Sequence, residues 1–461
     1  MTPYLLIDFG TTSTKATAVD LDTGTFSPPR SFPSVTVLPA VAGHSELSLE
    51  GIAARFDEIC CQYRDAAGLP LAGIVLCSEM HGFAVLDRND RPLTPYIGWR
   101  DERSLERIDE VSTFDLVIGR LGSSFKAVTG MNPRPGFPLL NLIHLGRQGL
   151  LPAQGRVVSL PGWLARISGD GRGLDHPTLL AGMTYYDVAR RKISTELLDL
   201  TREMTGFIAE LDRPAAAGEV AGYWRHGEER IPILVAAGDH QCSVLGAGLT
   251  PGEALSLNLG TGSQASVLRP DLLPEAETRP YFDDLQLQAI THVPAGRALA
   301  EYVGFLETAA GGAVDYWHLL GEIPADEAVA SDLEIDLAIF PGARGYKEGG
   351  RIGRVHEGRL TPRHYLASLL RCLAAQYAPV FRALDPEQQR RRCLLSGGIA
   401  RRLPVLQELI ERYSGYTTEG AAALDESLIG LRALALVGDG RAATCLEAWQ
   451  LFGRRCPVDA L

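Results

Sequence analysis

The chain has 461 residues, of which 46% are hydrophobic and 22% are charged, and its formal net charge is −12. This length exceeds what one hydrophobic core usually supports, so two or three globular domains are expected rather than a disordered chain. The acidic balance argues against a nucleic-acid partner, and no stretch approaches roughly 18 uncharged apolar residues, so we expect no membrane association and a cytoplasmic location.

A β-hairpin is expected near the amino terminus. Tyr4–Asp8 and a β-prone run through Val19 flank a Gly/Thr turn at Gly10–Thr12. An amphipathic helix is predicted over Gly51–Ala67, and the apolar run Ile74–Cys77 follows it as a strand. This alternation indicates an α/β fold.

A second hairpin is expected at Ala254–Ser266, around the turn Gly260-Thr261-Gly262. D-F-G-T-T-S at 8–13 and N-L-G-T-G-S at 258–263 share G-T-x-S in register, which favours a duplicated domain. A boundary near residue 246 gives domains of residues 1–245 and 246–461. Apolar residues at helical spacing predict helices in the second domain over these segments: Phe305–Leu320, Arg363–Leu384, Pro404–Tyr413 and Ser427–Val437.

Both hairpin turns suit phosphate. Backbone N–H groups can surround phosphate oxygens only where side chains leave room, which favours Gly with Ser or Thr. Gly10–Ser13 and Gly260–Ser263 both meet that need. Neither is a Walker loop, and each turn alone would also fit an ordinary hairpin.

Charged residues flank the first turn. Asp8 precedes it by two residues, and a carboxylate at a strand end beside a phosphate loop suits Mg²⁺, although it could also be a simple turn residue. Lys15 follows on the next strand and offers a positive charge to a β- or γ-phosphate.

Asp239 is the candidate catalytic base. It ends an apolar strand in A-A-G-D-H, where a close turn at Gly238 would expose its carboxylate. Phosphoryl transfer to an alcohol needs a carboxylate within hydrogen-bond reach of the hydroxyl. The alternative is an N-cap for a helix over Gln241–Gly246.

These residues belong to a series that resembles the FGGY family of carbohydrate kinases. Seven motifs occur in the order and approximate spacing of that family: D-F-G-T-T-S-T-K at 8–15, M-H-G at 80–82, W-R-D-E-R-S at 99–104, T-G at 129–130, G-D-H-Q-C at 238–242, N-L-G-T-G-S at 258–263 and S-G-G at 396–398. The resemblance spans nearly the whole chain. It implies an α/β fold of two actin-like (ribonuclease H-like) domains, an amino-terminal sugar-binding and a carboxyl-terminal nucleotide-binding one, with ATP and sugar meeting in an interdomain cleft.

The resemblance also implies ATP and Mg²⁺ as cofactors. It places Mg²⁺ at Asp8 and Asp239, and it places phosphate contacts at these residues: Thr11, Thr12, Ser13, Lys15, Gly260 and Thr261. Adenine is expected against Gly312, which stands five residues before Trp317, and against Gly398. Arg402 falls where the family often has an asparagine, so its contact with adenine is left open.

Sugar recognition is expected from Met80, His81, Trp99 and Arg103. Polyols need converging donors and acceptors beside an aromatic wall, and the stretches around 80 and 100 contain all three. His81 could instead be a hydrogen-bonded core histidine. M-H-G is more similar to ketose kinases than to glycerol kinases, so a ketose is the expected small-molecule partner.

Two differences from the family's motifs bear on which sugar is expected. His240 replaces the asparagine common after the catalytic aspartate, and the family's carboxyl-terminal signature survives only as Gly397-Gly398 with Gln407. The run G-D-x-Q-C-S resembles sedoheptulose kinases, so the first expectation is conversion of sedoheptulose to sedoheptulose 7-phosphate, with xylulose or ribulose next.

Two other classes compete with a kinase. An actin-like or chaperone-like ATPase would share both phosphate loops but needs no sugar pocket, whereas a sugar sensor with decayed catalysis is disfavoured because Asp8, Lys15 and Asp239 are all present. The sequence leaves homodimer formation open.

Overall fold

The computed structural model describes residues 3–11, 13–35, 37–38, 41–67, 70–252, 254–420, 422, 424–453 and 455–459. They form two compact units, the first made of Met1–Gly246, Thr278–Leu285 and Ser427–Leu461, and the second of Ala247–Glu277 and Gln286–Glu426. Within the part of the chain described here, no helix has the length and apolar character needed to cross a membrane.

The main sheet of the first unit positions the first turn. Its strands run in the order β17-β18-β6-β1-β2-β3, with β19 paired to β6 and β4 paired to β2. Their bounds are Pro3–Phe9 for β1, Ser13–Asp20 for β2, Thr25–Phe26 for β3, Arg30–Pro33 for β4, Gly73–Ser78 for β6, Val220–His226 for β17, Glu229–Leu234 for β18 and Ala237–Gly238 for β19. β1 and β2 form the predicted antiparallel hairpin, and β1 pairs in parallel with β6.

The two larger hydrophobic clusters among the described residues of this unit join its helices to its sheets. One packs α1 (Leu49–Ala67) against the main sheet through Phe56 and Ile59, which are fully buried. The other joins α2 (Thr113–Leu121), α4 (Pro138–Arg147) and α7 (Thr195–Thr205) to a small sheet of β15 (Ile208–Leu211), β11 (Gln154–Val158) and β7 (Ala84–Leu86). Further α-helices of the unit are α3 (Ser124–Thr129), α5 (Leu160–Leu164), α6 (Pro177–Gly182), α8 (Asp239–Gly246), α16 (Glu426–Gly438) and α17 (Cys445–Phe452).

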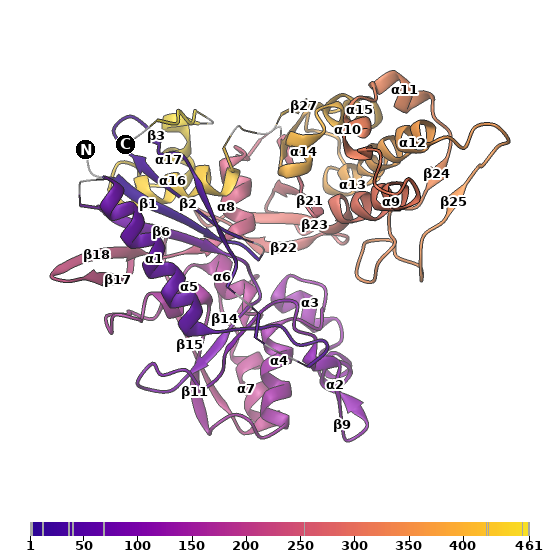
Figure 1. The fold of residues 1–461 in the computed structure, drawn as a ribbon. Helices are drawn as coiled ribbons and strands as arrows, with labels where there is room; N and C mark the ends of the chain where they lie inside the picture. The colour runs from indigo at the N-terminus through magenta and orange to yellow at the C-terminus, as the bar shows by residue number, and fades with distance from the viewer. Residues whose placement is uncertain are drawn as a thin grey trace. The chain divides into compact units, whose positions relative to one another are not determined.

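The unit boundaries differ from the predicted domains at the carboxyl-terminal end. Residues 427–461 were expected in the second domain, but they belong to the first unit, where α16 (Glu426–Gly438) contacts β1 and Phe452 of α17 packs against Gly24 in the turn between β2 and β3 (Figure 1). Ser427 donates a hydrogen bond to Asp8 at 2.6 Å. Gly430 lets α16 approach α8 closely, because a Cβ there would lie 2.0 Å from the carbonyl oxygen of Cys242.

The second unit repeats the hairpin arrangement of the first. Its central strands run in the order β23-β21-β20-β26-β27, with bounds Gln286–Pro294, Gly262–Leu268, Ala254–Leu259, Arg392–Ser396 and Thr417–Glu419. β20 and β21 form the predicted hairpin, and β20 pairs in parallel with β26 as β1 does with β6. The shared arrangement agrees with the expected duplication.

Helices cover this sheet around one large core. They are α9 (Gly296–Ala309), α10 (Tyr316–Gly321), α11 (Ala325–Ala330), α12 (Pro362–Ala375), α13 (Tyr377–Leu384), α14 (Gly398–Arg402) and α15 (Val405–Ser414). The single helix predicted over Phe305–Leu320 is wrong: α9 ends at Ala309, because Gly311 and Gly312 take positive φ angles of 64° and 77°. The helix predicted over Arg363–Leu384 is likewise divided, and Pro379 lies in the first turn of its second part.

Candidate active site

Three strand ends meet at one edge of the first unit's sheet. Asp8 pairs with Cys77, and Ala237 pairs with Cys77 from the other side. Since these three strands are parallel, their carboxyl ends lie together, and Glu79 and Asp239 follow directly from β6 and β19. Ligand sites of open α/β sheets form at this edge.

Asp239 follows β19 on one side of β6 at this edge, as the first residue of α8. Its Oδ1 accepts a hydrogen bond of 2.7 Å from the N–H of His240, the next residue, rather than from the N–H two or three positions on that an N-cap would use. Burial, followed by the negative charge of Asp8, raises the pKa of Asp239 to about 7. A carboxylate with this pKa can accept a proton near neutral pH.

Gly238 allows the close turn that the sequence predicted. Its N–H donates to Thr178 Oγ1 at 3.0 Å. A Cβ at this position would lie 2.6 Å from Gln241 Oε1 and 3.0 Å from Met80 Sδ, so a larger residue would have to displace these two side chains.

Asp8 and Lys15 face each other across the first hairpin as a directly paired couple. Paired residues project to the same side of a sheet, so the carboxylate and the ammonium lie on one face. Asp8 is 8% exposed and accepts the hydrogen bond from Ser427. Its charge raises the pKa of Asp239, which shows that two carboxylates share this site. A divalent cation would relieve their repulsion, so the residues fit Mg²⁺.

The first turn is only partly described. Thr12 lies outside the described residues, and Ser13 begins β2 opposite Pro33. The Thr11 hydroxyl donates to Glu79 Oε2 at 2.6 Å, and the Thr11 carbonyl accepts from Ser34 Oγ at 2.9 Å.

The predicted sugar residues Met80, His81 and Trp99 lie on this same unit. Met80 is 6% exposed and packs beside Gly238. His81 adopts a φ of 70°, its Nδ1 bonds the Gly182 carbonyl at 2.9 Å, and its ring lies 4.8 Å from that of Phe137. Trp99 is 39% exposed, so its ring is available to a ligand.

Arg103 is placed differently from the expected sugar contact. It is 4% exposed, its Nε donates to Asp101 Oδ1 at 2.7 Å, and its NH2 donates to Glu46 Oε1 at 2.6 Å. A guanidinium held between two carboxylates has few donors left for a sugar. The arrangement makes Arg103 a support for the 99–104 loop.

Two residues that the sequence reading missed lie beside Asp239. The negative charge of Glu79 raises the pKa of Asp239, and the positive charge of Arg279 lowers it. Arg279 is 5% exposed, and its NH1 lies 3.4 Å from His240 Nδ1. Glu79 could have been found from its position directly before Met80 and His81. No sequence motif pointed to Arg279.

The second unit holds the other predicted turn. The N–H groups that open α9 donate to it, from Gly296 to the Gly260 carbonyl at 3.1 Å and from Arg297 to the Thr261 carbonyl at 2.7 Å. Gly397 has a φ of 92°, and a Cβ there would lie 2.5 Å from the Leu259 carbonyl oxygen. Backbone contacts therefore hold the turn, and they leave no room for a side chain at the flanking Gly397.

The residues expected around adenine form part of the same unit. Gly312 and Gly398 have no heavy atom within 4 Å of where a Cβ would be. The Arg402 guanidinium lies 3.9 Å from the centre of the Trp317 ring, a cation–π geometry. Arg402 is thus held against Trp317, which is consistent with a planar surface near Gly312.

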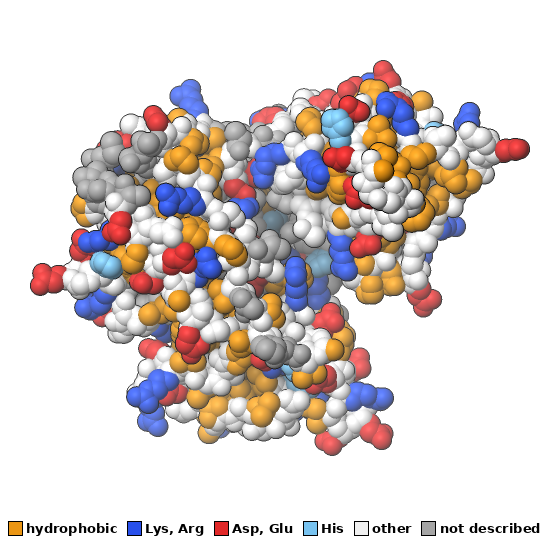
Figure 2. All heavy atoms as spheres, viewed as in Figure 1, with side chains coloured by type: hydrophobic (Ala, Val, Ile, Leu, Met, Phe, Trp, Pro, Cys, Tyr) orange, Lys and Arg blue, Asp and Glu red, His pale blue; other side chains and the backbone are white. Residues whose placement is uncertain are grey.

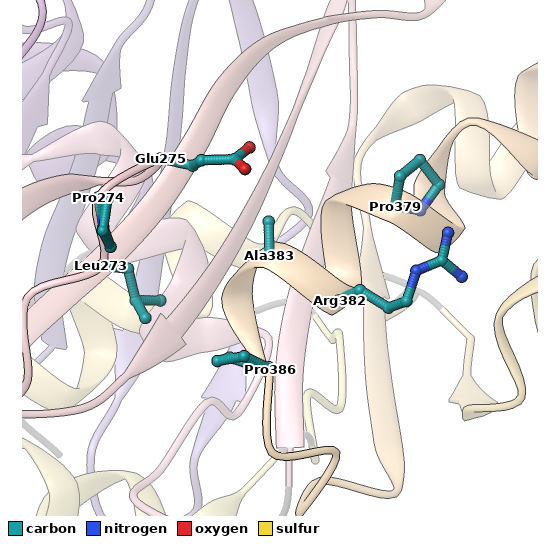
Figure 3. A pocket seen from close by; sticks show the side chains of 7 residues that line it. All are labelled: Leu273, Pro274, Glu275, Pro379, Arg382, Ala383 and Pro386. Carbon is teal, nitrogen blue, oxygen red and sulfur yellow. The ribbon is translucent and has the colours of Figure 1, made fainter.

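A hollow in the first unit belongs to this site, and another in the second unit does not. A cavity of about 100 Å³ in the first unit is lined by residues that include Thr11, Glu79, Trp99 and Arg100. A larger one of about 420 Å³ in the second unit lies between Leu273–Glu275 and the end of α13 (Figure 3), away from every predicted residue. Acidic and basic side chains are interspersed on the face of the molecule shown in Figure 2.

Comparisons with known proteins agree with this arrangement. Residues 3–246 match the model of the FGGY family of carbohydrate kinases, N-terminal domain. Xylulose kinase of Escherichia coli is 28% identical over 221 residues, which are 47% of this chain and 43% of that protein. Xylulose kinase of Lactococcus lactis is 23% identical over 262 residues, 56% of this chain and 51% of that protein. The chain thus matches about half the length of these curated relatives.

Solved structures show the same fold. The xylulose kinase from Rhodospirillum rubrum has a TM-score of 0.80 at 19% identity, covering 97% of this chain and 92% of its own. Glycerol kinase of Plasmodium falciparum with ADP has a TM-score of 0.77 at 14% identity, covering 100% and 95%. The expected actin-like two-domain α/β fold is confirmed. The chain belongs to the FGGY family of carbohydrate kinases.

Proposed function

We propose that the chain is an ATP-dependent sugar kinase that transfers the γ-phosphoryl group of MgATP to a terminal hydroxyl of a ketose. The observation that supports this most directly is Asp239, a carboxylate with a pKa of about 7 at the meeting point of three strand ends. Family membership supplies the reaction class, and the paired Asp8 and Lys15 supply the charges that phosphate and Mg²⁺ require.

In the proposed reaction the protein contributes position and one proton acceptor. Asp239 accepts the proton of the attacking hydroxyl, while Met80, His81 and Trp99 orient the sugar. Lys15 and the backbone N–H groups of the turns at Thr11 and Thr261 hold the phosphates. Asp8 and Asp239 would hold Mg²⁺, which when bound neutralises phosphate charge. Adenine is proposed to lie against Gly312 and Gly398 of the second unit, with Ser13 and Gly260 completing the turns and Arg402 beside Trp317.

The choice of ketose rests on two separate indications. Both curated relatives named above are xylulose kinases, which favours xylulose. The G-D-H-Q-C-S run at 238–243 favours sedoheptulose. We propose xylulose as the first substrate to test and sedoheptulose as the second.

The test is sugar-stimulated ADP release across xylulose, sedoheptulose, ribulose, fructose and glycerol. A ketose should give the highest kcat/KM, and glycerol should be poor because it leaves buried polar groups of the site unpaired. If a folded, ATP-binding preparation released ADP at the same rate with every sugar as without sugar, an ATPase would replace the kinase.

The pH profile should report Asp239. Because its folded pKa is raised to about 7, the ionised, proton-accepting form predominates only above that pH. We therefore expect kcat/KM for the sugar to rise with pH and reach half of its plateau near pH 7, when it is measured between about pH 5 and 9 at MgATP well below its KM, so that the profile reports the free enzyme. A profile that is already flat above about pH 5 would show that the base has an ordinary carboxyl pKa.

Replacing His81 should affect the sugar step alone. His81→Ala is expected to lower kcat/KM for the best ketose by roughly tenfold or more, while ADP release without sugar stays nearly unchanged. Since alanine is strained at a φ of 70°, His81→Asn, which tolerates this conformation, keeps the backbone comparable. His318→Ala, at an exposed histidine, is the matched control and should behave as wild type. Loss of both activities in the asparagine variant would make His81 structural.

A further inference from the structure

A short chain of hydrogen bonds joins the first turn to the proposed sugar wall. Trp99 Nε1 donates to Thr11 Oγ1 at 3.0 Å, and Thr11 Oγ1 donates to Glu79 Oε2 at 2.6 Å. An indole N–H can only donate, and an ionised carboxylate can only accept, so the direction of both bonds is fixed. The hydrogen of the Thr11 hydroxyl therefore points to Glu79.

The three residues come from separate parts of one unit. Thr11 lies in the turn after β1, and Glu79 follows β6, where its N–H donates to the Phe9 carbonyl at 3.0 Å. Trp99 follows β8 (Tyr96–Ile97), and its carbonyl oxygen would lie 1.9 Å from a Cβ at Gly136, so its backbone is closely packed. Backbone contacts thus fix Glu79 and Trp99, and the two hydrogen bonds of Thr11 connect the turn to both residues.

The surroundings of Glu79 favour a role beyond a surface contact. The three side chains line the cavity of about 100 Å³, and the Arg100 guanidinium lies 5.1 Å from the centre of the Trp99 ring. Burial raises the pKa of Glu79, and the hydrogen bond from Thr11 counters this shift by stabilising the ionised form. The Thr11 hydroxyl is one of the side-chain donors that lower the pKa of Glu79, together with Tyr96 and Trp99, so its removal would leave the buried carboxylate with fewer donors.

We propose that Glu79 is a positioning residue, which holds the Thr11 hydroxyl and thereby couples the phosphate turn to the Trp99 wall of the sugar site. This inference rests on the proposed kinase function. It follows that the Thr11 hydroxyl is already used, so this turn would contact phosphate through its backbone N–H groups. It also follows that a sugar packed on Trp99 restrains the turn through one shared hydroxyl.

A double-mutant cycle tests the coupling. Thr11→Val keeps the shape of the side chain but removes the hydroxyl, and Trp99→Phe keeps an aromatic wall but removes the N–H donor. Each single variant should lower kcat/KM for ATP by about three- to tenfold. The double variant should lose about as much as the worse of the two single variants. Losses that multiply would overturn the coupling. Thr11→Ser should restore wild-type kinetics, and Thr23→Val, in the remote β2–β3 turn, is the matched control.

Variants at Glu79 separate positioning from a general structural role. Assayed at about pH 8, Glu79→Met should raise KM for ATP about threefold or more, as Thr11→Val does. Glu79→Gln keeps an acceptor for the hydroxyl and should stay within about threefold of wild type. Equal losses in the two variants, or a fall in thermal stability with no change in KM for ATP, would contradict the proposal.

An activity-independent readout keeps this inference distinct from the kinase proposal. The chain has five tryptophans, and the indole N–H signal of Trp99 in ¹⁵N-resolved NMR is identified by its loss in Trp99→Phe. That signal should shift in Thr11→Val and Glu79→Met, whereas the signal of Trp224, whose Nε1 donates to Asp57, should not. An unchanged Trp99 signal would disprove the hydrogen-bond chain even in an active kinase. A shifted signal in a protein that no sugar stimulates would mean that the kinase proposal had failed instead.

Discussion

Asp239→Asn should lower kcat by roughly 10²–10⁴ while KM for the sugar and for MgATP stays within a few-fold. Asparagine keeps the shape of the side chain, and its Oδ1 can still accept the 2.7 Å hydrogen bond from the His240 N–H, so the start of α8 is preserved. It cannot accept the proton of a sugar hydroxyl. Steady-state ADP release measures the loss, and a variant that kept more than a tenth of wild-type turnover would remove Asp239 from the role of base.

The same variant should be more stable than wild type at alkaline pH. The folded pKa of Asp239 is raised to about 7 from 3.8, so folding favours its protonated form. That contribution to stability is fully present below about pH 4 and is lost as the pH rises through about 7. Asparagine is neutral throughout, so the gain in Tm over wild type should be larger at about pH 8 than at about pH 5. Asp199→Asn, at an exposed position in α7, is the matched control and should show no such difference.

Local signals in the sequence were enough to predict both hairpins and the strand end that Asp239 follows. Each depends on neighbours in the chain: alternating apolar residues, a Gly/Thr turn, or a glycine before an aspartate. The elements predicted least well depend on distant contacts. Residues 427–461 join the first unit because Ser427 bonds Asp8 and Gly430 packs on Cys242, and a sequence shows neither partner.

The difference between local and distant contacts also explains which site residues could be predicted from the sequence. The run at 99–104 contains four charged side chains in a row, and only the fold shows that Arg103 is held by Asp101 and by Glu46, 57 residues earlier. Glu79 was passed over beside Met80 and His81, because its partner Thr11 is 68 residues away. Which polar residue faces a ligand is decided by such pairings, whereas the type of chemistry was readable from the residues alone.

Lys15→Ala should lower kcat/KM for ATP by roughly 10²–10³, with KM for the sugar changed by no more than a few-fold. Lys15 is paired with Asp8 across the hairpin, so its ammonium lies on the face that presents the Asp8 carboxylate. The proposed role is to balance negative charge that shifts onto phosphate oxygens during transfer, which makes its loss larger in the transition state than in the bound substrate. Initial rates over a matrix of ATP and sugar concentrations separate the two effects.

Two companion variants decide whether charge or packing is responsible. Lys15→Met keeps the aliphatic stem without the ammonium and should lose as much as alanine, because a phosphate contact depends on charge. Lys192→Ala removes an exposed lysine on β14 (Lys192–Ile193), in a different small sheet, and should leave the kinetics unchanged. If Lys15→Met were nearly as active as wild type while alanine was not, the side chain would act by packing against the hairpin. The phosphate site would then have to rely on the backbone of the two turns and on Mg²⁺ alone.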